Sequence, residues 1–552
     1  MKLLIVGGVA AGASAAARAR RVCEDCQITV FDRGEHVSFA NCGLPYYVGG
    51  VIPDRDDLLL AGPELFRERL NIDVRTRTEV VSVNADARTL SIRDLLTGAT
   101  AEVRYDALIL APGARPVTPP LPGLDLPGVF RLRTIPDATK IKNAAAHAKH
   151  ATVIGAGFIG LEMAENLRTL GLDVTVIERA PRVLPPIDPE LSILVERRLV
   201  AHGVDLRTGT SVTGIEQTDA GLLVHADADI PTDLVLLAIG VRPESELARD
   251  AGLAIGPHGG ILVDAEMQTS DPHIWAAGDA VEVHSLLTDH WQLLPLAGPA
   301  NRQGRIAGEN AVRGERDAVV FRGVQGTAIA EVFGLAVGVT GASEQLLARQ
   351  AAIPWGRVDL HPGHHVGYYP GSKTLSLKLL YRLDDGRVLG AQAVGEKGVA
   401  RRIDVVSTAI QLGGTVHDLA ESELAYAPQF GAAKDPINLA GMIAVNNLRG
   451  DLPLDAWSTL GGPPILDVRT PKEFADGHIE GAVNVPLDEL RGRMDEVPDG
   501  PLHIICAVGK RAYYATRLLR QKGKDARVLS GGMKTYLALH EAGALPGGPG
   551  PA

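Results

Sequence analysis

One pattern occurs twice in this 552-residue chain: an apolar strand, a glycine-rich turn, a helix, and a second strand that ends in an acidic residue. The first copy is LLIVGGVAAGASAAARARR followed by QITVFDR, and the second is ATVIGAGFIGLEMAENLRTLGLDVTVIER. In such a unit the turn lies at the helix N-terminus, where glycines let the backbone close on a pyrophosphate. One copy is a weak indication of a nucleotide site, but two copies favour two dinucleotide sites.

FAD and NAD(P)H are the simplest pair of occupants for these sites. The first copy predicts FAD contacts from Gly7, Gly8, Ala10, Ala11, Gly12, Asp32 and Arg33. The second copy predicts NAD(P)H contacts from Gly155, Gly157, Phe158, Ile159, Gly160 and Glu178. Val9 replaces the usual middle glycine of the first turn. Glu178 can accept a hydrogen bond from a ribose 2′-hydroxyl but repels a 2′-phosphate, which favours NADH. The adjacent Arg179 leaves NADPH possible.

Two further segments resemble the FAD-binding signatures of the two-dinucleotide flavoprotein oxidoreductases. They are YDALILAPGARP at residues 105–116 and TSDPHIWAAGDA at residues 269–280. The resemblance implies that Asp279 binds the ribityl chain of the flavin. The further cofactor contacts that we expect are Ala111, Gly113, Gly240 and Gly278.

Cys42, in the segment SFANCGLPYYVGG, indicates where the electrons go. A flavoenzyme can pass electrons to oxygen, a quinone, an iron–sulfur partner or a thiol, and a cysteine placed beside the flavin favours the thiol. A helix that starts at Gly43 and Leu44 predicts a lowered pKa for Cys42, and so a nucleophilic thiolate at neutral pH. No second cysteine follows for hundreds of residues, so the reaction pairs one protein thiol with one substrate thiol.

The segments SFANCGLPYY and AYAPQFGAAKDP, with the flanking nucleotide sites, closely resemble coenzyme A-disulfide reductases over about residues 1 to 448. The resemblance implies a mixed disulfide between Cys42 and coenzyme A, and a homodimer whose active site is shared between subunits. Tyr368 and Tyr426 would reach that site from the other subunit, with Tyr369 as the second choice, and their phenols could protonate a leaving thiolate.

Contacts to coenzyme A are expected from one face of the first helix and from residues that the resemblance adds. Ser14, Arg18 and Arg21 follow an i, i+4, i+7 spacing, which places them on one face. The resemblance adds Ser38, Asn41, Asn301 and Lys434. Some members have a lysine near residue 70, where this chain has Leu70, so the phosphate contacts are expected to be redistributed.

A separate α/β unit follows, with the segments ILDVRTPKEFADGHIEGAVNVPLDEL and LHIICAVGKRAYYATRLL. It resembles a single rhodanese domain, in which Cys506 would carry sulfane sulfur as a persulfide. The short loop after Cys506 is rich in backbone N–H groups and forms an anion cradle, to which Lys510 and Arg511 add positive charge. Asp467 and Arg469 are expected to be structural supports.

The predicted fold class is therefore α/β: two Rossmann-like domains for FAD and NAD, an α+β dimerisation domain and a C-terminal α/β rhodanese domain. The expected limits are 1–114 and 241–321 for the FAD domain, 115–240 for the NAD(P)H domain, 322–448 for the dimerisation domain, 449–454 for a linker and 455–547 for the rhodanese domain.

The amino-acid composition limits the expected binding partners and the expected cellular compartment. The formal charge of −11 has no Lys/Arg-rich block within it, which argues against nucleic acid and acidic membrane surfaces as partners. No apolar run reaches the roughly 20 residues that span a bilayer, so we expect a cytoplasmic protein. The four cysteines cannot form a disulfide scaffold, and we expect Cys23 and Cys26 to be incidental thiols. No metal site is predicted, including at HPGHHVGYY.

The sequence thus predicts an FAD-dependent NAD(P)H oxidoreductase that reduces coenzyme A disulfide, or a persulfide or polysulfide of coenzyme A, with Cys506 as a sulfur carrier. Two alternatives remain. The first is an NADH peroxidase or oxidase, in which one cysteine cycles through sulfenic acid. Those enzymes have a histidine in the first glycine-rich turn, where this chain has Ala10. The second is a redox sensor or sulfur carrier that does not turn over substrate.

Overall fold

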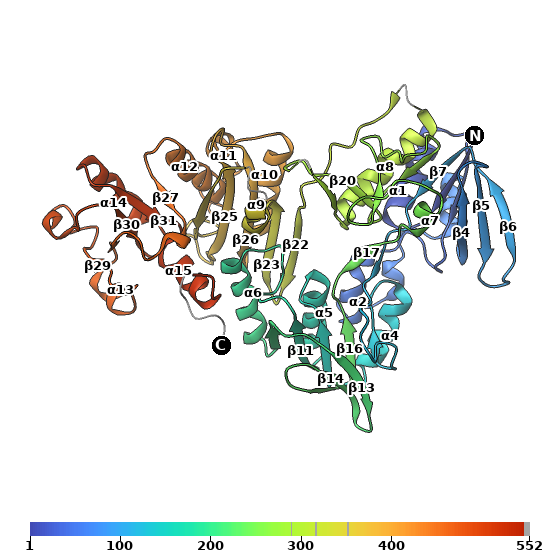
Figure 1. Ribbon diagram of the computed structural model, residues 1–552, viewed down its shortest axis with the longest axis horizontal. Coiled ribbons are helices and arrows are strands. Elements are labelled where there is room, and N and C mark those ends of the chain that lie inside the picture. The colour runs from blue at the N-terminus through green and yellow to red at the C-terminus, as the bar shows by residue number, and fades with distance from the viewer. Residues whose placement is uncertain (289, 315–316, 350–352, 546–552) are drawn as a thin grey trace. The chain divides into compact units, whose positions relative to one another are not determined.

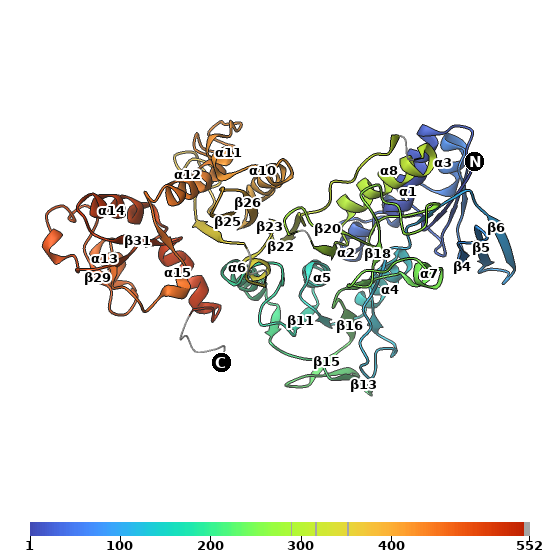
Figure 2. The same ribbon diagram turned by 45° about the horizontal axis from the view of Figure 1, so that its top comes forward.

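The computed structural model describes residues 1–288, 290–314, 317–349 and 353–545 (Figures 1 and 2). Residues 546 and 547, the last two of the predicted rhodanese domain, lie outside this range. The chain forms two compact units: Met1–Arg179 with Thr210–Val324, and Ala180–Gly209 with the chain from Gln325 onwards. The segment 180–209, predicted as part of the NAD(P)H domain, therefore clusters with the C-terminal half.

The first unit contains a parallel sheet in the order β19–β7–β1–β2–β3, built by the first glycine-rich repeat and the two later signatures. Its strands are β1 Lys2–Val6, β2 Gln27–Phe31, β3 Asp73–Arg75, β7 Ala107–Leu110 and β19 Ile274–Ala276. Helices α1 Ala10–Val22 and α8 Ala297–Arg313 pack against each other. Gly304 and Gly308 permit this approach, because an added Cβ would lie 2.1 and 2.2 Å from carbonyl oxygens of α1.

The second glycine-rich repeat builds a second parallel sheet, in which β11, β10, β16 and β9 lie side by side. The strands are β9 Val129–Phe130, β10 His150–Ile154, β11 Asp173–Glu178 and β16 Leu234–Leu237, and α5 Phe158–Thr169 follows the turn. The other elements of this unit are α2 Leu44–Val48, α3 Pro63–Leu70, β4 Thr78–Asn84, β5 Thr89–Asp94, β6 Thr100–Arg104, β8 Ala114–Pro116, α4 Ile135–Ala145, β13 Gly214–Thr218, β14 Gly221–His225, β15 Ile230–Thr232, β17 Val241–Pro243, α7 Glu246–Asp250, β18 Ile261–Leu262, β20 Val281–His284 and β21 Trp291–Leu293.

The second unit begins with an antiparallel sheet in the order β22–β23–β26–β25–β24. Its elements are β22 Ala328–Val332, β23 Leu335–Gly341, α9 Glu344–Arg349, β24 Trp355–Leu360, β25 Leu375–Arg382, β26 Val388–Gly395, α10 Val399–Gln411, α11 Val416–Glu421 and α12 Pro436–Leu448, with α6 Pro189–Ala201 and β12 Asp205–Thr208. The buried Lys378 ammonium of β25 binds Asp188 at 3.1 Å and also Glu190, which ties the start of α6 to this sheet.

The C-terminal domain is a parallel sheet in the order β27–β31–β30–β28–β29. Its elements are β27 Leu454–Asp455, β28 Ile465–Asp467, α13 Pro471–Ala475, β29 Val483–Asn484, β30 Leu502–Ile505, α14 Lys510–Gln521, β31 Ala526–Leu529 and α15 Gly532–Glu541. Helix α15 packs on α6 through Ala538 and Ile193. His361 of the segment after β24 bonds to Thr535 of α15 at 2.9 Å. The predicted α/β fold class is confirmed.

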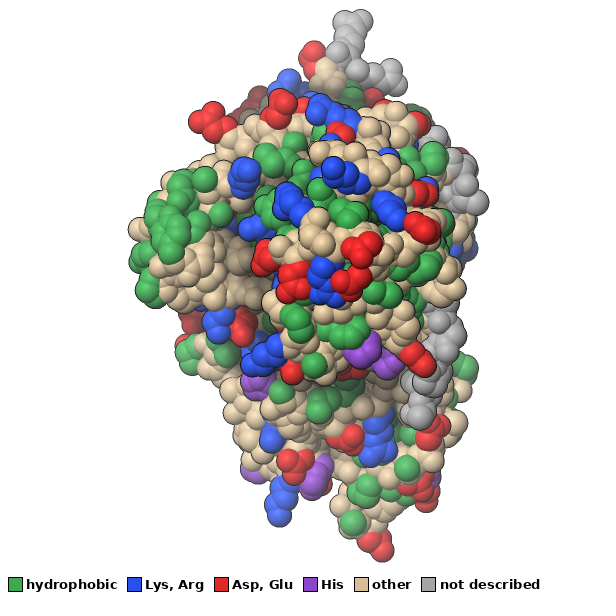
Figure 3. All heavy atoms as spheres, turned by 90° about the vertical axis from the view of Figure 1, so that its left-hand side faces the viewer, with side chains coloured by type: hydrophobic (Ala, Val, Ile, Leu, Met, Phe, Trp, Pro, Cys, Tyr) green, Lys and Arg blue, Asp and Glu red, His purple; other side chains and the backbone are tan. Residues whose placement is uncertain are grey.

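The surface seen from the side of the C-terminal domain mixes the two signs of charge. Figure 3 shows basic and acidic side chains interspersed over this face, with apolar side chains between them. Side chains of both signs therefore lie close together on the described part of this face. Among the described residues, no helix is both long and apolar enough to cross a membrane.

Cys23 and Cys26 form a disulfide, so the prediction of incidental thiols is wrong. The turn between α1 and β2 brings the two residues together, with their Cα atoms 5.5 Å apart. Spacing alone could not decide this, because a C-x-x-C pair can also be two separate thiols or half of a metal site. Among the described residues, no group of three or more His, Cys, Asp or Glu side chains is placed to hold a metal ion.

Candidate active site and sulfur-carrier site

Three segments that are far apart in the sequence meet at the carboxyl ends of β1, β7 and β19. A Cβ on Gly7 would lie 2.1 Å from the carbonyl oxygen of Ala111, and a Cβ on Gly278 would lie 2.9 Å from the Cβ of Ala11. The backbone at Gly7 and Gly278 also has positive φ, which glycine adopts most readily. The segments predicted to bind FAD, with Gly113 beside them, therefore form one cradle.

Asp32 closes this cradle at the end of β2. Its carboxylate accepts hydrogen bonds from the backbone N–H groups of Gly8, at 2.8 Å, and Gly34, at 2.7 Å. The carboxylate is thus held beside the turn, where the ribose of a dinucleotide would lie. Arg33, which follows Asp32, instead points to Glu244 and binds it at 2.6 Å.

Asp279 is a buried acid whose environment suits a polar ligand. Burial raises its pKa to about 6, and the charge of Arg133 offsets only part of this shift. A carboxyl group with few compensating charges is costly to bury, and hydroxyl groups of a ligand could satisfy it. This fits the role that the resemblance assigns to Asp279, contact with the ribityl chain.

The second turn leaves room for a dinucleotide at the carboxyl ends of β10 and β16. A Cβ on Gly155 would lie 2.5 Å from the carbonyl oxygen of Ala238, and one on Gly160 would lie 2.0 Å from that of Gly155. In contrast, a Cβ on Gly157 or Gly240 would meet nothing within 4 Å. Gly155 and Gly160 therefore close the turn, whereas Gly157 and Gly240 border open space that NAD(P)H could fill.

Helix α5 starts immediately after Gly157, with Phe158 half-buried and Ile159 42% exposed at its N-terminal end. Glu178 accepts a hydrogen bond from the backbone N–H of Ala156 at 2.7 Å, as Asp32 does from Gly8 in the first repeat. The two nucleotide cradles are thus built alike, and both fit the cofactors predicted for them.

Cys42 lies in a single 3-10 turn, Asn41–Gly43, that precedes α2. Its side chain is exposed, and its backbone N–H donates to the side-chain oxygen of Asn41 at 3.0 Å. The predicted lowering of the pKa of Cys42 is wrong. Partial burial of the thiol raises this pKa, and the negative charges of Glu162 and Asp279 raise it further. Cys42 therefore lies within electrostatic reach of Asp279 of the flavin cradle.

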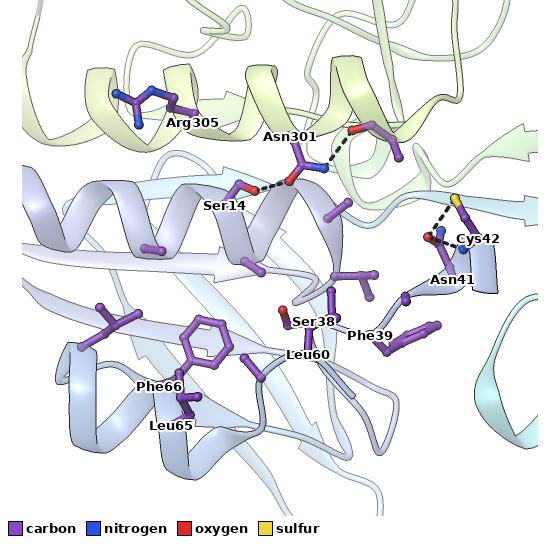
Figure 4. Close-up of a pocket in the computed structure, with 18 of the residues that line it drawn as sticks. Ser14, Ser38, Phe39, Asn41, Cys42, Leu60, Leu65, Phe66, Asn301 and Arg305 are labelled. Atoms are coloured by element: carbon purple, nitrogen blue, oxygen red, sulfur yellow. Dashed lines mark hydrogen bonds between the residues drawn. The ribbon is translucent and has the colours of Figure 1, made fainter. Parts of the chain in front are cut away.

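A cavity of about 570 Å³ extends from Cys42 along α1, and we call it the α1 groove (Figure 4). One face of the helix lines it at a regular helical spacing, from Ala10 through Ser14 to Arg21. At 1.5 Å per residue, this stretch of helix is roughly 16 Å long. Apolar side chains from α3 and the loop before it line another side: Leu60, Ala61, Leu65, Phe66 and Leu70.

Polar groups lie at both ends of the α1 groove. Ser38, Asn41 and Cys42 line one end, and Ser14 binds Asn301 of α8 at 2.6 Å between the ends. Arg21 and Arg305 line the groove farther along the helices. The sequence analysis did not predict Arg305, although it lies one helical turn after Asn301 and therefore shares its face of α8. It is a candidate to replace the lysine that is absent at Leu70.

One of the predicted coenzyme A contacts lies outside the groove. The Arg18 side chain points to α8, where it binds Glu309 at 2.6 Å, and the groove is lined by Ser14, Ala17 and Arg21 instead. The i, i+4, i+7 spacing placed all three polar residues on one face, but helix packing separates Arg18 from the other two. Lys434 is exposed and belongs to the other compact unit.

Tyr368 and Tyr426 form a pair on the second unit, 58 positions apart in the sequence. Their hydroxyl oxygens are 3.0 Å apart, and the side chains are 75% and 46% exposed. The hydrogen bond to Tyr368 raises the pKa of Tyr426. Tyr369 instead contacts the ring of His365 edge-on. The two residues predicted to act together are thus neighbours and are accessible to another molecule.

Cys506 ends β30 in the C-terminal domain, and its environment differs from that of Cys42. The side chain is only 1% exposed, and its sulfur accepts hydrogen bonds from the N–H groups of Gly509, at 3.2 Å, and Ala512, at 3.3 Å. Gly509 has a φ of +93°, which aims its N–H at the sulfur. The predicted anion cradle is present in this loop.

The charged residues around Cys506 have separate roles. Lys510 begins α14 and is exposed. Arg511 makes two hydrogen bonds to Glu473, at 2.7 and 2.6 Å, so its charge is shared with that carboxylate. Arg469 binds the buried Asp467 and also donates to the carbonyl of Gly477, which follows α13.

Comparison with known proteins identifies the class. Residues 1–304 match the pyridine nucleotide-disulphide oxidoreductases, residues 327–435 match the dimerisation domain of the same family, and residues 452–539 match rhodanese-like domains. The chain therefore belongs to the pyridine nucleotide-disulphide oxidoreductase family, whose members bind FAD and NAD(P)H, and carries a C-terminal rhodanese-like domain.

Individual relatives show which members of the family this chain is similar to. The crystal structure of reduced Bacillus anthracis CoADR-RHD has 43% sequence identity and a TM-score of 0.94, with 98% of each chain covered. The structure of an NAD-dependent persulfide reductase from A. fulgidus has 40% identity and a TM-score of 0.90, covering 97% of this chain and 100% of that one. A protein named NADH oxidase from Methanocaldococcus jannaschii is 36% identical over 456 residues, 81% of this chain and 99% of its own. The predicted resemblance to coenzyme A-disulfide reductases fused to a rhodanese domain is confirmed.

Proposed function

We propose that this chain is an NAD(P)H-dependent reductase of coenzyme A disulfide and of coenzyme A persulfide or polysulfide, with Cys42 as the redox cysteine and Cys506 as the sulfur carrier. The observation that carries the proposal is the α1 groove, which has a thiol at one end and two arginines farther along. Coenzyme A has the same order of groups, a thiol on a long arm and phosphates at the other end.

The walls of the groove suit the parts of such a ligand. Ser14, Asn41 and Asn301 offer hydrogen bonds to the amides of the arm, and apolar side chains such as Phe66 pack along it. Arg21 and Arg305 would bind phosphate through charge-assisted hydrogen bonds. These walls support the proposal of a long, anionic thiol as the ligand, with its sulfur at the Cys42 end.

FAD and NAD(P)H, when bound in the two cradles, supply the two electrons that reduce a disulfide. The residues of the chain carry out the thiol–disulfide exchange and the proton transfers. The Cys42 thiolate attacks an S–S bond of the substrate, forms a mixed disulfide with one sulfur and releases the other half as a thiolate. Only the thiolate attacks, so Cys42 must lose its proton first. Partial burial, and then the charges of Glu162 and Asp279, raise the pKa of Cys42 and make this proton harder to remove.

A shared active site would complete the groove. We propose that Tyr368 and Tyr426 of a second subunit face the Cys42 end and donate a proton to the leaving thiolate, and that Lys434 adds a contact to coenzyme A. The support is the exposed hydrogen-bonded pair of phenols on the unit that carries the dimerisation domain.

The need for reduced nicotinamide nucleotide is the reason to place the protein in the cytoplasm.

Steady-state oxidation of NADH tests the reductase. We expect continuous turnover with coenzyme A disulfide and with coenzyme A persulfide under nitrogen, and sulfide release with the persulfide. A single stoichiometric reduction without turnover would contradict an enzyme and favour a redox sensor. Cys506→Ser should slow turnover of the persulfide but not of the disulfide; an equal rate with the persulfide would contradict the sulfur-carrier role.

An NADH oxidase is the second candidate, because one relative has that name. In that case NADH would be consumed in air without any disulfide, and Cys42 would carry oxygen as sulfenic acid. The α1 groove would then have no ligand to bind. Comparing oxygen with coenzyme A disulfide at equal concentration separates the two, and a rate with oxygen at least tenfold higher would favour the oxidase.

A further inference from the structure

The Cys23–Cys26 pair lies in the turn that follows α1. This turn is next to the end of the α1 groove that Arg21 and Arg305 line, which we call the arginine end. We propose that this disulfide is a second thiol–disulfide exchange site, which reacts with low-molecular-weight thiols and disulfides and alters the arginine end of the groove. That the relevant thiol is coenzyme A rests on the proposed function; the exchange chemistry and its effect on the fold do not.

The short spacing of the pair argues against a purely structural bond. A disulfide stabilises mainly by restricting the unfolded chain, and the gain falls as the closed loop shortens. Only three positions separate Cys23 from Cys26, so the loop is among the shortest that can close. If the protein is in the cytoplasm, as proposed above, a second argument applies, since disulfides in reducing compartments are usually transient and are catalytic or redox-sensing. A reversible role therefore suits this pair better than a permanent one.

The two sulfurs differ in accessibility, which sets the direction of attack. Cys26 is 3% exposed and packs in the core of the flavin sheet, whereas Cys23 is only partly buried. A thiolate in solution would reach the sulfur of Cys23 and displace Cys26. The guanidinium of Arg20 donates hydrogen bonds to the backbone carbonyls of Cys23 and Cys26, so a buried positive charge lies in the turn that carries the leaving thiolate.

The exchange balances without another oxidant or reductant. The first thiolate forms a bond to the Cys23 sulfur, and the Cys23–Cys26 bond breaks with its electron pair on Cys26. A second thiolate attacks the outer sulfur of this mixed disulfide and releases Cys23. The net result is that two small thiols become one small disulfide and the protein disulfide becomes two thiols, which take up the two protons. The reverse reaction consumes a small disulfide.

Arg20 connects this turn to the wall of the α1 groove. The side chain is 4% exposed and donates to five backbone carbonyls: those of Cys23, Glu24, Cys26, Leu70 and Asn71. Three of these acceptors lie in the disulfide turn, and two lie at the C-terminal end of α3. One buried cation therefore holds together the turn and the end of α3.

The end of α3 is also part of the groove. Leu70 both lines the groove and accepts the hydrogen bond from Nε of Arg20 at 2.7 Å. Arg21, the next residue on α1, lines the same end. When the disulfide opens, three of the five Arg20 acceptors are freed to move. We expect α3 to loosen and the arginine end to bind its ligand more weakly.

The cysteine content of the chain allows a clean assay of the exchange. The chain has four cysteines, so Cys42→Ser with Cys506→Ser leaves only this pair. The flavin-loaded double variant is equilibrated in buffers of coenzyme A and its disulfide at varied ratios, separated rapidly from these small molecules, and then titrated with a thiol reagent under native conditions. We expect no reactive thiol in disulfide-rich buffer, two in thiol-rich buffer, and full reversal. Thiols that appear only after denaturation, or that never oxidise, would overturn the exchange site.

Hydrogen exchange tests the connection to α3 without any ligand. In the same variant, amides of Pro63–Leu70 should exchange at least fivefold faster after reduction, with α10 in the other unit as the unchanged reference. Adding Cys23→Ser and Cys26→Ser should give the fast rates in every buffer. Equal rates in both redox states would overturn the connection.

Titration with coenzyme A tests the effect on the groove. Binding to the double variant should weaken at least threefold on reduction, and an unchanged affinity would overturn the regulatory part of the proposal. If coenzyme A binds in neither redox state, the proposed substrate is wrong, while the thiol titration still decides the exchange site.

Discussion

The two catalytic candidates, Cys42 and Cys506, are opposite solutions to placing a reactive sulfur. Cys42 is a surface residue beside an open groove, and partial burial of its thiol, followed by neighbouring carboxylates, raises its pKa. Cys506 is buried, and two backbone N–H groups point at its sulfur. The loop of the protein itself therefore supplies hydrogen-bond donors to the Cys506 sulfur. At Cys42 the ligand and the bound cofactor must complete the site.

Removing each sulfur in turn tests whether Cys42 and Cys506 act at separate sites, and it should give the largest effect. Cys42→Ser should lower NADH-dependent reduction of coenzyme A disulfide by at least about a thousandfold, because the nucleophile is lost. Cys506→Ser should leave that rate within about twofold. The measurement is the initial rate of NADH oxidation with retained flavin as the folding control. Equal losses in both variants would mean that the two sulfurs form one site.

The α1 groove is lined by Cys42 and not by Cys506. The variant Arg305→Met tests whether this groove binds the substrate. Removing one cation that contacts phosphate should raise KM for coenzyme A disulfide about tenfold, since a charge-assisted hydrogen bond contributes about 1.4 kcal/mol or more. Arg302→Met is the matched control, because Arg302 lies on the same helix and stacks on Phe321. If both variants change KM equally, the groove is not the binding site.

The cradle at Cys506 depends on the positive φ of Gly509. Gly509→Ala should slow sulfur uptake by Cys506 from a persulfide donor about fivefold, because alanine in this conformation costs about 1 kcal/mol and turns the N–H from the sulfur. Gly500→Ala is the control, since Gly500 also has positive φ, at +87°, and a Cβ there meets nothing within 4 Å. Similar rates in the two variants would show that only backbone strain matters.

The smallest expected effect concerns proton affinity at Cys42. Glu162→Gln removes a charge that raises the pKa of Cys42, so the thiolate forms at lower pH and the pH profile of alkylation shifts down. A shift of about half a pH unit would raise the rate at pH 7 about threefold. Alkylation of Cys506 should not change. An upward shift for Cys42 would contradict the assignment of Glu162.

The sequence predicted what local motifs encode and missed what distant residues decide. Glycine-rich turns and terminal acids are local, and both nucleotide cradles were predicted from them. The pairing of Arg18 with Glu309 joins positions 291 apart, so helix periodicity alone could not exclude Arg18 from the groove. The pKa of Cys42 was predicted with the wrong sign because it depends on burial of the thiol and on the charges of Glu162 and Asp279, which are far away in the sequence. The role of each site residue and the domain limits remain predictions.

The central claim is that Cys42 pairs with coenzyme A, and the molecule attached to Cys42 tests it most directly. The protein is purified without reductant, digested, and the peptide containing Cys42 is weighed before and after reduction. We predict a mass increase equal to coenzyme A that reduction removes, with free coenzyme A recovered in equal amount. A peptide that carries only added oxygen, or no adduct even after incubation with coenzyme A disulfide, would contradict the account.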